Sequence, residues 1–489
     1  MVVDVERHTR LAGQVLPETG LLIGDEWLRA AGGGQYAHVN AATGLPQAAV
    51  PLAGPAEVDA AVASARAAFP AWRGARPDER RSALLRLAAL IRSRAELIGQ
   101  VLTLECGSPI GGATALPARA ADYLEYYAGL ADKIEGSVIP IFPERAFDYT
   151  LPEPYGVVAV VSTWNGGISA LARKAGAALA AGNTVVAKAM ELAPFSAVLF
   201  GQLALLAGFP PGVLNVLPGG VPAGQALVAH PGVDKISFTG GVDAARKILV
   251  AAAQHITPVV LELGGKSGNI VFPDADLDAA GAFAGVACMR NSGQGCVMPT
   301  RLIVHSSIHD VVVEKALAGI AAMPIGDPLD PATAFGPLVS ASHLDRVLGM
   351  IAGHGGELLT GGHRLDEPGF FVAPTVVDRV AADAPLAQEE VFGPVLTVLT
   401  FDDEDEAVAL ANGVAYGLAG YVHTTDLSRA HRVAAALDAG YVSLNGFAAL
   451  PAGAPFGGFG RSGYGKEGGR AGLAEFVRTK NVYLPLELR

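Results

Sequence analysis

Cysteine is scarce in this chain, which has three among 489 residues: Cys106, Cys288 and Cys296. A small, odd number of cysteines in so long a chain does not form a disulfide framework. The sequence therefore favours a reducing compartment, the cytoplasm, where a reactive thiol stays intact. No cysteine or histidine residues have metal-ligand spacing, and the 11 histidines are dispersed. We therefore expect no metal site.

Long apolar runs and a surplus of positive charge are also missing. The richest apolar stretch, Ser196 to Phe209, contains Gln202 and is shorter than the roughly 18 residues of a membrane span. The first residues carry acidic side chains and no apolar core, so we expect no secretory signal. The net charge is −12 and the positive residues are scattered. We expect neither a nucleic-acid partner nor a membrane partner.

The chain is long enough for two or three domains, and 51% of its residues are hydrophobic. Residues 1 to about 50 look irregular, whereas residues 56 to about 133 show helical spacing of apolar side chains. Two short strand-like runs then flank Pro143-Glu144-Arg145. They predict a hairpin that either protrudes to meet a partner or packs as an edge of its own domain.

From residue 156, strand-like and helix-like runs alternate. The strand-like runs are 157–161, 184–187, 213–217, 235–238 and 258–261. They are continuously apolar, which is typical of a parallel sheet covered by helices on both faces. This predicts a doubly wound α/β domain whose ligand binds beyond the carboxyl ends of the strands. The Gly-x-Gly-x-x-Gly fingerprint is missing, although glycines follow strand ends at Gly219-Gly220, Gly224 and Gly240-Gly241. A second α/β pattern begins near residue 269.

Cys296 lies in a segment, Asn291 to Arg301, that is rich in glycine and amide side chains. Glycines let a backbone approach a ligand closely, and a cysteine there is a candidate nucleophile because its thiolate is reactive near neutral pH. The alternative is a small buried core residue. The segment alone supports both interpretations.

Glu262 ends an apolar strand and is followed by Gly264 and Gly265. A carboxylate in such an apolar site has a raised pKa and can accept a proton near neutral pH. The alternative is a helix-capping or ion-paired surface acid.

Two further strand ends carry polar side chains. Asn165, in Trp164-Asn165-Gly166-Gly167, can donate a hydrogen bond to an oxyanion, although Asn-Gly is also ordinary turn chemistry. Lys188 and Glu191 can hold a ribose through its hydroxyls, or form a solvated pair.

Seven motifs occur in a fixed order along the chain. They are Trp164-Asn165, Lys188-Ala-Met-Glu191, Phe238-Thr239-Gly240, Glu262-Leu263-Gly264-Gly265-Lys266-Ser267, Gly293-Gln-Gly-Cys296, Glu389-Glu390-Val-Phe392-Gly-Pro394 and Pro455-Phe-Gly-Gly458. Together they resemble the NAD(P)-dependent aldehyde dehydrogenase superfamily over nearly the whole chain. The resemblance implies an α/β fold with a Rossmann-type NAD-binding domain (1–127 and 152–260), an α/β catalytic domain (261–465) and a β oligomerisation arm (128–151 and 466–489). It also implies a homodimer or homotetramer.

The resemblance implies a mechanism as well. Cys296 would attack the aldehyde carbon, and the Asn165 side chain and the Cys296 N–H would hold the oxyanion of the thiohemiacetal. Hydride would pass to the nicotinamide, and Glu262 would activate the water that hydrolyses the resulting thioester. Lys174 and Glu467 match family positions proposed for a proton path.

The expected cofactor is NAD. The positions that match cofactor-binding residues of the family are Trp164, Lys188, Glu191, Gly220, Phe238, Thr239, Gly240, Gly241, Leu263, Glu390 and Phe392. Lys188 and Glu191 would bind the adenosine ribose, and a carboxylate there repels the 2′-phosphate of NADP. We therefore expect NAD to be preferred over NADP.

The chain departs from the family pattern at several positions. Thr163 replaces the common proline before Trp-Asn, and Gly241 replaces a frequent serine. Gly166, Ala170 and Leu450 match positions that line the substrate tunnel in the family, where smaller side chains widen the passage. A wide apolar tunnel favours a hydrophobic aldehyde. The presence of Glu262 favours release of a free acid over transfer to coenzyme A.

Two other functions remain open from the sequence. Cys296 could serve a cofactor-independent, thioesterase-like hydrolase, or the chain could be a catalytically silent structural or binding protein. The complete set of Cys296, Glu262 and Asn165 argues against the silent protein. The sequence does not identify the aldehyde.

Overall fold

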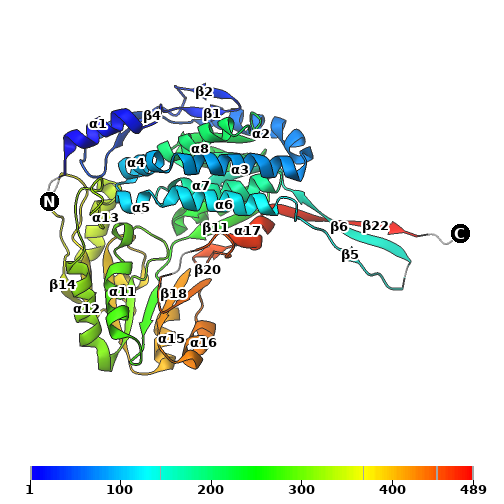
Figure 1. The fold of residues 1–489 in the computed structure, drawn as a ribbon. Helices are drawn as coiled ribbons and strands as arrows, with labels where there is room; N and C mark the ends of the chain where they lie inside the picture. The colour runs from blue at the N-terminus through cyan, green and yellow to red at the C-terminus, as the bar shows by residue number, and fades with distance from the viewer. Residues whose placement is uncertain (1–2, 144, 367, 448–449, 487–489) are drawn as a thin grey trace.

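The computed structural model describes residues 3–143, 145–366, 368–447 and 450–486 (Figure 1). An eight-stranded sheet has the order β2-β1-β9-β8-β7-β10-β11-β21, and all its strands except β21 come from the first 263 residues. Its strands are β1 (Leu21–Ile23), β2 (Glu26–Leu28), β7 (Val157–Val161), β8 (Thr184–Met190), β9 (Leu214–Gly219), β10 (Lys235–Gly240), β11 (Val259–Leu263) and β21 (Gly463–Tyr464). Strands β9, β8, β7, β10 and β11 pair in parallel. Strand order reverses between β7 and β10, and a ligand crevice is expected beyond the carboxyl ends at such a point.

Both faces of this sheet are covered, as its continuously apolar strands predict. In β7, Val158 and Val160 pack into one apolar cluster, whereas Val157, Ala159 and Val161 pack into the other. Alternate side chains point to opposite faces of a strand, so a strand buried on both sides is apolar throughout. The first cluster includes α3 (Pro77–Ser93), α4 (Ala95–Cys106), α6 (Leu116–Leu130), α7 (Gly167–Ala180) and α8 (Phe195–Leu206). The second includes α2 (Pro55–Gly74), α9 (Val221–Val228) and α10 (Val242–Ala253).

A seven-stranded sheet forms the second α/β layer, in the order β14-β15-β16-β13-β12-β18-β19. Its strands are β12 (Gly268–Val271), β13 (Arg301–His305), β14 (Glu357–Thr360), β15 (Thr375–Asp378), β16 (Val395–Phe401), β18 (Ala419–His423) and β19 (Tyr441–Leu444). All pairs are parallel except that of β14 with β15. Its helices are α11 (Leu277–Ala287), α12 (His309–Ala321), α13 (Ala341–Ala352), α15 (Glu404–Asn412) and α16 (Leu427–Ala436).

A three-stranded antiparallel sheet extends away from the body of the molecule (Figure 1). It consists of β5 (Val138–Ile139), β6 (Ala146–Pro154) and the C-terminal β22 (Val477–Pro485). The hairpin expected around residues 143–145 is thus present as β5 and β6, and Glu144 lies outside the described residues. Large apolar side chains are exposed on this arm, among them Val138, Phe142 and Leu484.

The first 50 residues are not irregular, contrary to the sequence-based expectation. They form α1 (Val5–Val15), β1, β2, β3 (Gln35–Val39) and β4 (Pro46–Pro51). Helix α1 was missed because it is polar on average and only His8 and Ala12 are buried in it. His8 is held at long range by Asp327, with Nε2 at 2.8 Å from Oδ1.

The remaining elements are short. They are α5 (Ile110–Ala113), α14 (Pro385–Gln388), α17 (Gly469–Ala474), η1 (Arg290–Gly293), η2 (Ser306–Ile308), β17 (Tyr416–Gly417) and β20 (Phe459–Gly460). Helix α6 runs through the expected boundary at 127/128, and β6 runs through that at 151/152. Of the helices in the described ranges, none combines the length and the apolar character that a membrane crossing requires.

Candidate active site

Cys296 lies in the loop between α11 and β13, and this loop has unusual backbone geometry. Asn291 and Ser292 have φ angles of 49° and 56°, a region that residues other than glycine rarely occupy. The Ser292 hydroxyl donates to the Gly336 carbonyl over 2.7 Å. Backbone strain of this kind persists only where surrounding contacts enforce it.

The environment of Cys296 differs from that of the other cysteines. Cys106 and Cys288 are buried in apolar clusters, whereas Cys296 is only partly buried and belongs to neither. The interpretation of Cys296 as a small core residue is therefore wrong.

Asn165 follows strand β7 at the switch point of the first sheet. Its Nδ2 donates to the Gln294 carbonyl over 3.2 Å, which places the amide beside the cysteine loop. Gly265 reaches the same loop from another direction, because a Cβ atom on it would lie 2.6 Å from the Cys296 carbonyl oxygen. The structure thus brings Asn165 and the Glu262-to-Ser267 segment to the candidate nucleophile.

Glu262 lies in β11, between Thr239 of β10 and Gly463 of β21. Its residue surface is 1% exposed, and neither carboxylate oxygen has a hydrogen-bond partner among the described residues. Burial, followed by the negative charge of Glu467, raises the pKa of Glu262 to about 8. Glu262 is therefore neither a surface acid nor a helix cap, and its pKa is raised as the sequence predicts.

The thiol of Cys296 is less acidic than an ordinary cysteine. Burial, followed by the negative charges of Glu262 and Glu390, raises its pKa. The thiol form consequently dominates at neutral pH in the protein alone.

A buried ionic cluster adjoins Glu262. The Glu467 carboxylate pairs with Lys174 and with Arg173, whose Nε lies 2.5 Å from Oε2. Burial alone would raise the pKa of Glu467, but Arg173 and Lys174 together lower it. Burial lowers the pKa of Lys174, and Glu467 only partly offsets this. Lys174 and Glu467 therefore meet, and they meet close enough to influence Glu262 electrostatically.

Sequence reasoning missed Arg173. It is the neighbour of Lys174, and these two are the only charged side chains in the otherwise apolar helix α7. Its guanidinium lies over the rings of Tyr123 and Phe456, at 5.8 and 5.5 Å from their centroids. Two consecutive cations in an otherwise apolar helix indicate that a buried carboxylate pairs with them, here that of Glu467.

A second group of predicted residues lies at the carboxyl ends of β8, β9 and β10. Lys188 lies within β8 and not just beyond it, because the strand continues to Met190 instead of ending at residue 187; its Nζ lies 3.8 Å from Glu191 Oε2. Lys188 is buried, which excludes a solvated pair. Gly220 and Gly241 are the N-caps of α9 and α10, and neither helix has a side-chain cap. Gly224 lies inside α9, not at a strand end.

The remaining predicted residues connect the two groups. Glu390 Oε1 accepts a hydrogen bond from the Gly265 N–H over 2.9 Å, and burial raises its pKa to about 7. The Phe392 ring packs edge-on against Trp164, with centroids 5.6 Å apart. Leu263 and Phe238 are buried, and a Cβ on Gly240 would lie 2.3 Å from the Phe238 ring. The buried Thr239 hydroxyl has no partner in the described ranges.

These residues fit a dinucleotide. Uncapped helix N-termini offer N–H groups to phosphates, and the space beside Gly241 is open, because an added Cβ would meet no atom within 4 Å. Glu191 lies beside Gly220, within 3.8 Å of the position of an added Cβ. A carboxylate and an ammonium there can bind ribose hydroxyls.

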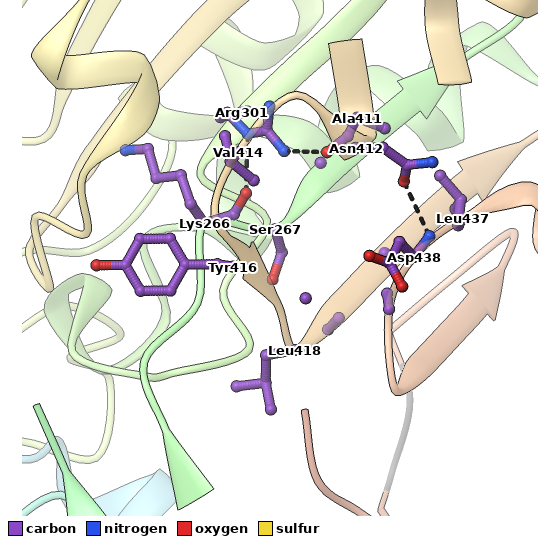
Figure 2. Close-up of a pocket in the computed structure, with 15 residues that line it drawn as sticks. Lys266, Ser267, Arg301, Ala411, Asn412, Val414, Tyr416, Leu418, Leu437 and Asp438 are labelled. Atoms are coloured by element: carbon purple, nitrogen blue, oxygen red, sulfur yellow. Dashed lines mark hydrogen bonds between the residues drawn. The ribbon is translucent and has the colours of Figure 1, made fainter. Parts of the chain in front are cut away.

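Lys266 and Ser267, at the end of the Glu262-to-Ser267 segment, line a small cavity of about 20 Å³ (Figure 2). Arg301 lines it and donates to the carbonyl oxygens of Lys266, Leu410 and Ala411. Lys266 is also buried, and its ammonium has no hydrogen-bond partner among the residues described. Burial, followed by the charge of Arg301, lowers the pKa of Lys266 to about 7. The cavity is too small for a substrate, so we assign it to the packing of the segment.

Comparison with known proteins agrees with this arrangement. The aldehyde dehydrogenase family profile matches residues 27–482. The chain is 41% identical to gamma-glutamyl-gamma-aminobutyraldehyde dehydrogenase from Burkholderia cenocepacia J2315, with a TM-score of 0.95 and 99% of each chain covered. It is 40% identical to PnpE from Pseudomonas sp. WBC-3, crystallised with nicotinamide adenine dinucleotide, with a TM-score of 0.94 over 97% of this chain and 99% of PnpE.

An NADP-dependent enzyme from E. coli is 36% identical, with a TM-score of 0.94 over 97% of this chain and 99% of that one. The α/β fold with parallel sheets is therefore shared with these enzymes throughout. Given the match over most of its length and the placement of Cys296, Glu262 and Asn165 at one edge of the first sheet, the chain belongs to the aldehyde dehydrogenase family.

Proposed function

We propose that this aldehyde dehydrogenase uses NAD to oxidise an aldehyde and releases the free carboxylic acid. The observation that carries the proposal is the buried carboxylate of Glu262, which is unpaired among the described residues and acts on the pKa of Cys296. A buried carboxylate without a partner is unfavourable for folding. A role as a base toward the attacking water explains why this costly carboxylate lies beside a nucleophile.

The side chains then divide the chemistry. Cys296 Sγ attacks the aldehyde carbon, and its thiol proton passes to solvent water, which can reach this partly buried residue. The oxyanion of the thiohemiacetal is held by the Asn165 amide and the Cys296 N–H. After the thioester forms, Glu262 takes a proton from the attacking water, and the acid leaves as Cys296 regains its thiol. Each oxyanion donor is worth about 10²–10³ in rate.

The cofactor site supports NAD. When bound, NAD would accept the hydride that the thiohemiacetal carbon loses. Lys188 and Glu191 would hold the adenosine ribose, and the ends of α9 and α10 would face the phosphates. Glu191 would repel a 2′-phosphate, so kcat/KM should be higher with NAD than with NADP.

Aromatic side chains near the cysteine loop support a hydrophobic aldehyde. The Tyr421 hydroxyl donates to the carbonyl of Val297, the residue after Cys296, over 2.8 Å. The Tyr421 ring stacks on Phe447 with centroids 5.8 Å apart, and Phe283 packs against both rings. An apolar wall of this kind favours apolar over charged side chains on the substrate.

The arm and the domains extend the proposal. We infer that the exposed apolar side chains of β5, β6 and β22 are covered by a second copy, giving a homodimer or homotetramer. The NAD-binding part would then be 1–127 with 152–260, the catalytic part 261–465, and the arm 128–151 with 466–489. A cytoplasmic location would keep the Cys296 thiol reduced.

An aldehyde panel tests the proposal. With NAD and no coenzyme A, hydrophobic aldehydes should give NADH and free acid in equal amounts, and Cys296→Ala should abolish both. An absolute requirement for coenzyme A would overturn acid release, and higher kcat/KM with short polar aldehydes would overturn the substrate class. If NAD does not bind in calorimetry but activated esters are cleaved, the protein is the cofactor-independent hydrolase instead.

A further inference from the structure

The side-chain amide of Asn165 is oriented by a hydroxyl on its own loop. Thr163 Oγ1 donates to Asn165 Oδ1 over 2.6 Å, and Asn165 Nδ2 donates to the Gln294 carbonyl over 3.2 Å. Both ends of the amide are therefore engaged. In the family pattern that the chain resembles, a proline occupies position 163, and proline has no hydroxyl to donate.

These two contacts select one of the two amide orientations. If the amide rotated by 180°, its oxygen would face the oxygen of the Gln294 carbonyl, and two acceptors would oppose each other. The Thr163 hydroxyl and the Gln294 carbonyl thus favour the same orientation. In it, one Nδ2 hydrogen is used by the carbonyl, and among the described residues the second has no acceptor.

The Gln294 carbonyl is fixed from its other side as well. Asn291 Nδ2 donates to it over 3.2 Å, and the Ser108 hydroxyl donates to Asn291 Oδ1 over 2.8 Å. Two amides, each with a hydroxyl on its oxygen, therefore converge on one carbonyl two residues before Cys296. This carbonyl is a fixed reference point for the Asn165 amide.

We propose that Thr163 is a positioning residue of the oxyanion site, which acts by holding the Asn165 amide with its free N–H toward the reacting carbonyl oxygen. The proposal rests on the proposed function of Asn165. Donation from Thr163 to Oδ1 also polarises the amide and strengthens its N–H as a donor. Preorganised donors act on charge that develops in the transition state, so the hydroxyl should affect kcat and leave substrate binding alone.

Three variants at position 163 separate the hydroxyl from the shape of the side chain. Thr163→Val removes the hydroxyl and keeps the volume, Thr163→Ser keeps the hydroxyl, and Thr163→Ala is a second variant without it. A hydrogen bond of this kind is worth about 0.5–1.5 kcal/mol, so we expect kcat to fall by a factor between about 2 and about 13 in Thr163→Val and Thr163→Ala. The KM for aldehyde and the Kd for NAD should stay within about twofold of wild type. Thr163→Ser, which keeps the hydroxyl, should keep most of the wild-type kcat.

Thr184→Val is the matched control. Thr184 is buried at the amino end of β8, and its hydroxyl donates to the Ala65 carbonyl over 3.0 Å, far along the strand from the site. This variant should lower the melting temperature and leave kcat unchanged. If Thr184→Val also loses kcat in proportion to its loss of melting temperature, and the Thr163 variants follow the same proportion, Thr163 has a structural role only.

A cofactor-independent readout keeps the proposal distinct from the proposed function. Acylation of Cys296 by p-nitrophenyl acetate forms a tetrahedral oxyanion without NAD, so the p-nitrophenol burst rate should fall by the same factor in Thr163→Val. If wild type makes no NADH but this burst responds, the proposed oxidation fails and the role of Thr163 stands. The role of Thr163 would be overturned if Thr163→Val kept the wild-type burst rate and kcat. It would also be overturned if Thr163→Val and Thr163→Ser lost kcat equally.

Discussion

Replacing Glu467 with glutamine would leave two buried cations without their shared carboxylate. Removing one partner of a buried ion pair costs about 3–5 kcal/mol, because an uncompensated charge remains in the interior. Here the loss is moderated, since Lys174 Nζ keeps its 3.1 Å contact with Ser237 Oγ and Arg173 keeps two aromatic faces. We therefore expect Glu467→Gln to lower the free energy of unfolding by about 3 kcal/mol, the lower end of that range.

The same substitution should change the pH dependence of catalysis. Glu467 raises the pKa of Glu262 by like-charge repulsion, whereas Arg173 and Lys174 lower it. Replacing Glu467 removes one of the two influences that raise the pKa of Glu262, while burial and the cations that lower it remain, so this pKa falls. Since Glu262 acts as a base when it has lost its proton, the acidic limb of the kcat profile should move to lower pH.

Urea unfolding and kcat measured against pH check both effects. Lys174→Met is the control, because it leaves the pair of Arg173 with Glu467 intact. The double variant Lys174→Met/Glu467→Gln should be less destabilised than the sum of the single variants, as expected for residues of one network. A loss below about 1 kcal/mol in Glu467→Gln, or an acidic limb that moves to higher pH, would refute the assignment of this cluster.

Three further predictions follow from the site. Lys266→Met should stabilise the protein, and more at pH 6 than at pH 9. The lowered pKa of Lys266 makes its charged form unfavourable to folding, and this cost grows as the pH falls toward 7. Equal gains in the free energy of unfolding in urea at both pH values would contradict this. Alkylation of Cys296 by iodoacetamide should be slow at pH 7 and still rising at pH 10, because the thiol pKa is raised; a rate that levels off below pH 8 would indicate a stable thiolate. Glu191→Ser should reduce the preference for NAD over NADP in kcat/KM by removing the repulsive carboxylate, and an unchanged ratio would place the discrimination elsewhere.

Much of the fold could be predicted because its signals are local. The strands of the first sheet are apolar on both faces, and this pattern marks both ends of β7 and the ends of its neighbours within three residues. Helix α1 shows the limit of local signals. Its burial depends on Asp327, which lies 319 residues from His8 in the chain, and no short-range pattern reports such a contact.

The candidate site shows the same division. Glu262 was recognisable as a polar residue at the end of an apolar strand. The effect of burial on its pKa was predicted as well, but the further effect of Glu467 was not, because the antiparallel pairing of β11 with β21 brings that residue near. The hydroxyl of Thr163 looked like a simple departure from a family pattern until its contact with Asn165 was seen. Hydrogen-bond direction is a property of three-dimensional geometry.

The central claim is that Cys296 carries the acyl group and Glu262 releases it. Intact-protein and peptide mass spectrometry of Glu262→Gln, mixed with an aldehyde substrate and NAD, tests this directly. We predict that one acyl group accumulates on the peptide containing Cys296, with one NADH formed per site and little free acid. An unmodified Cys296 peptide after a full equivalent of NADH, or acid released at the wild-type rate, would contradict the account.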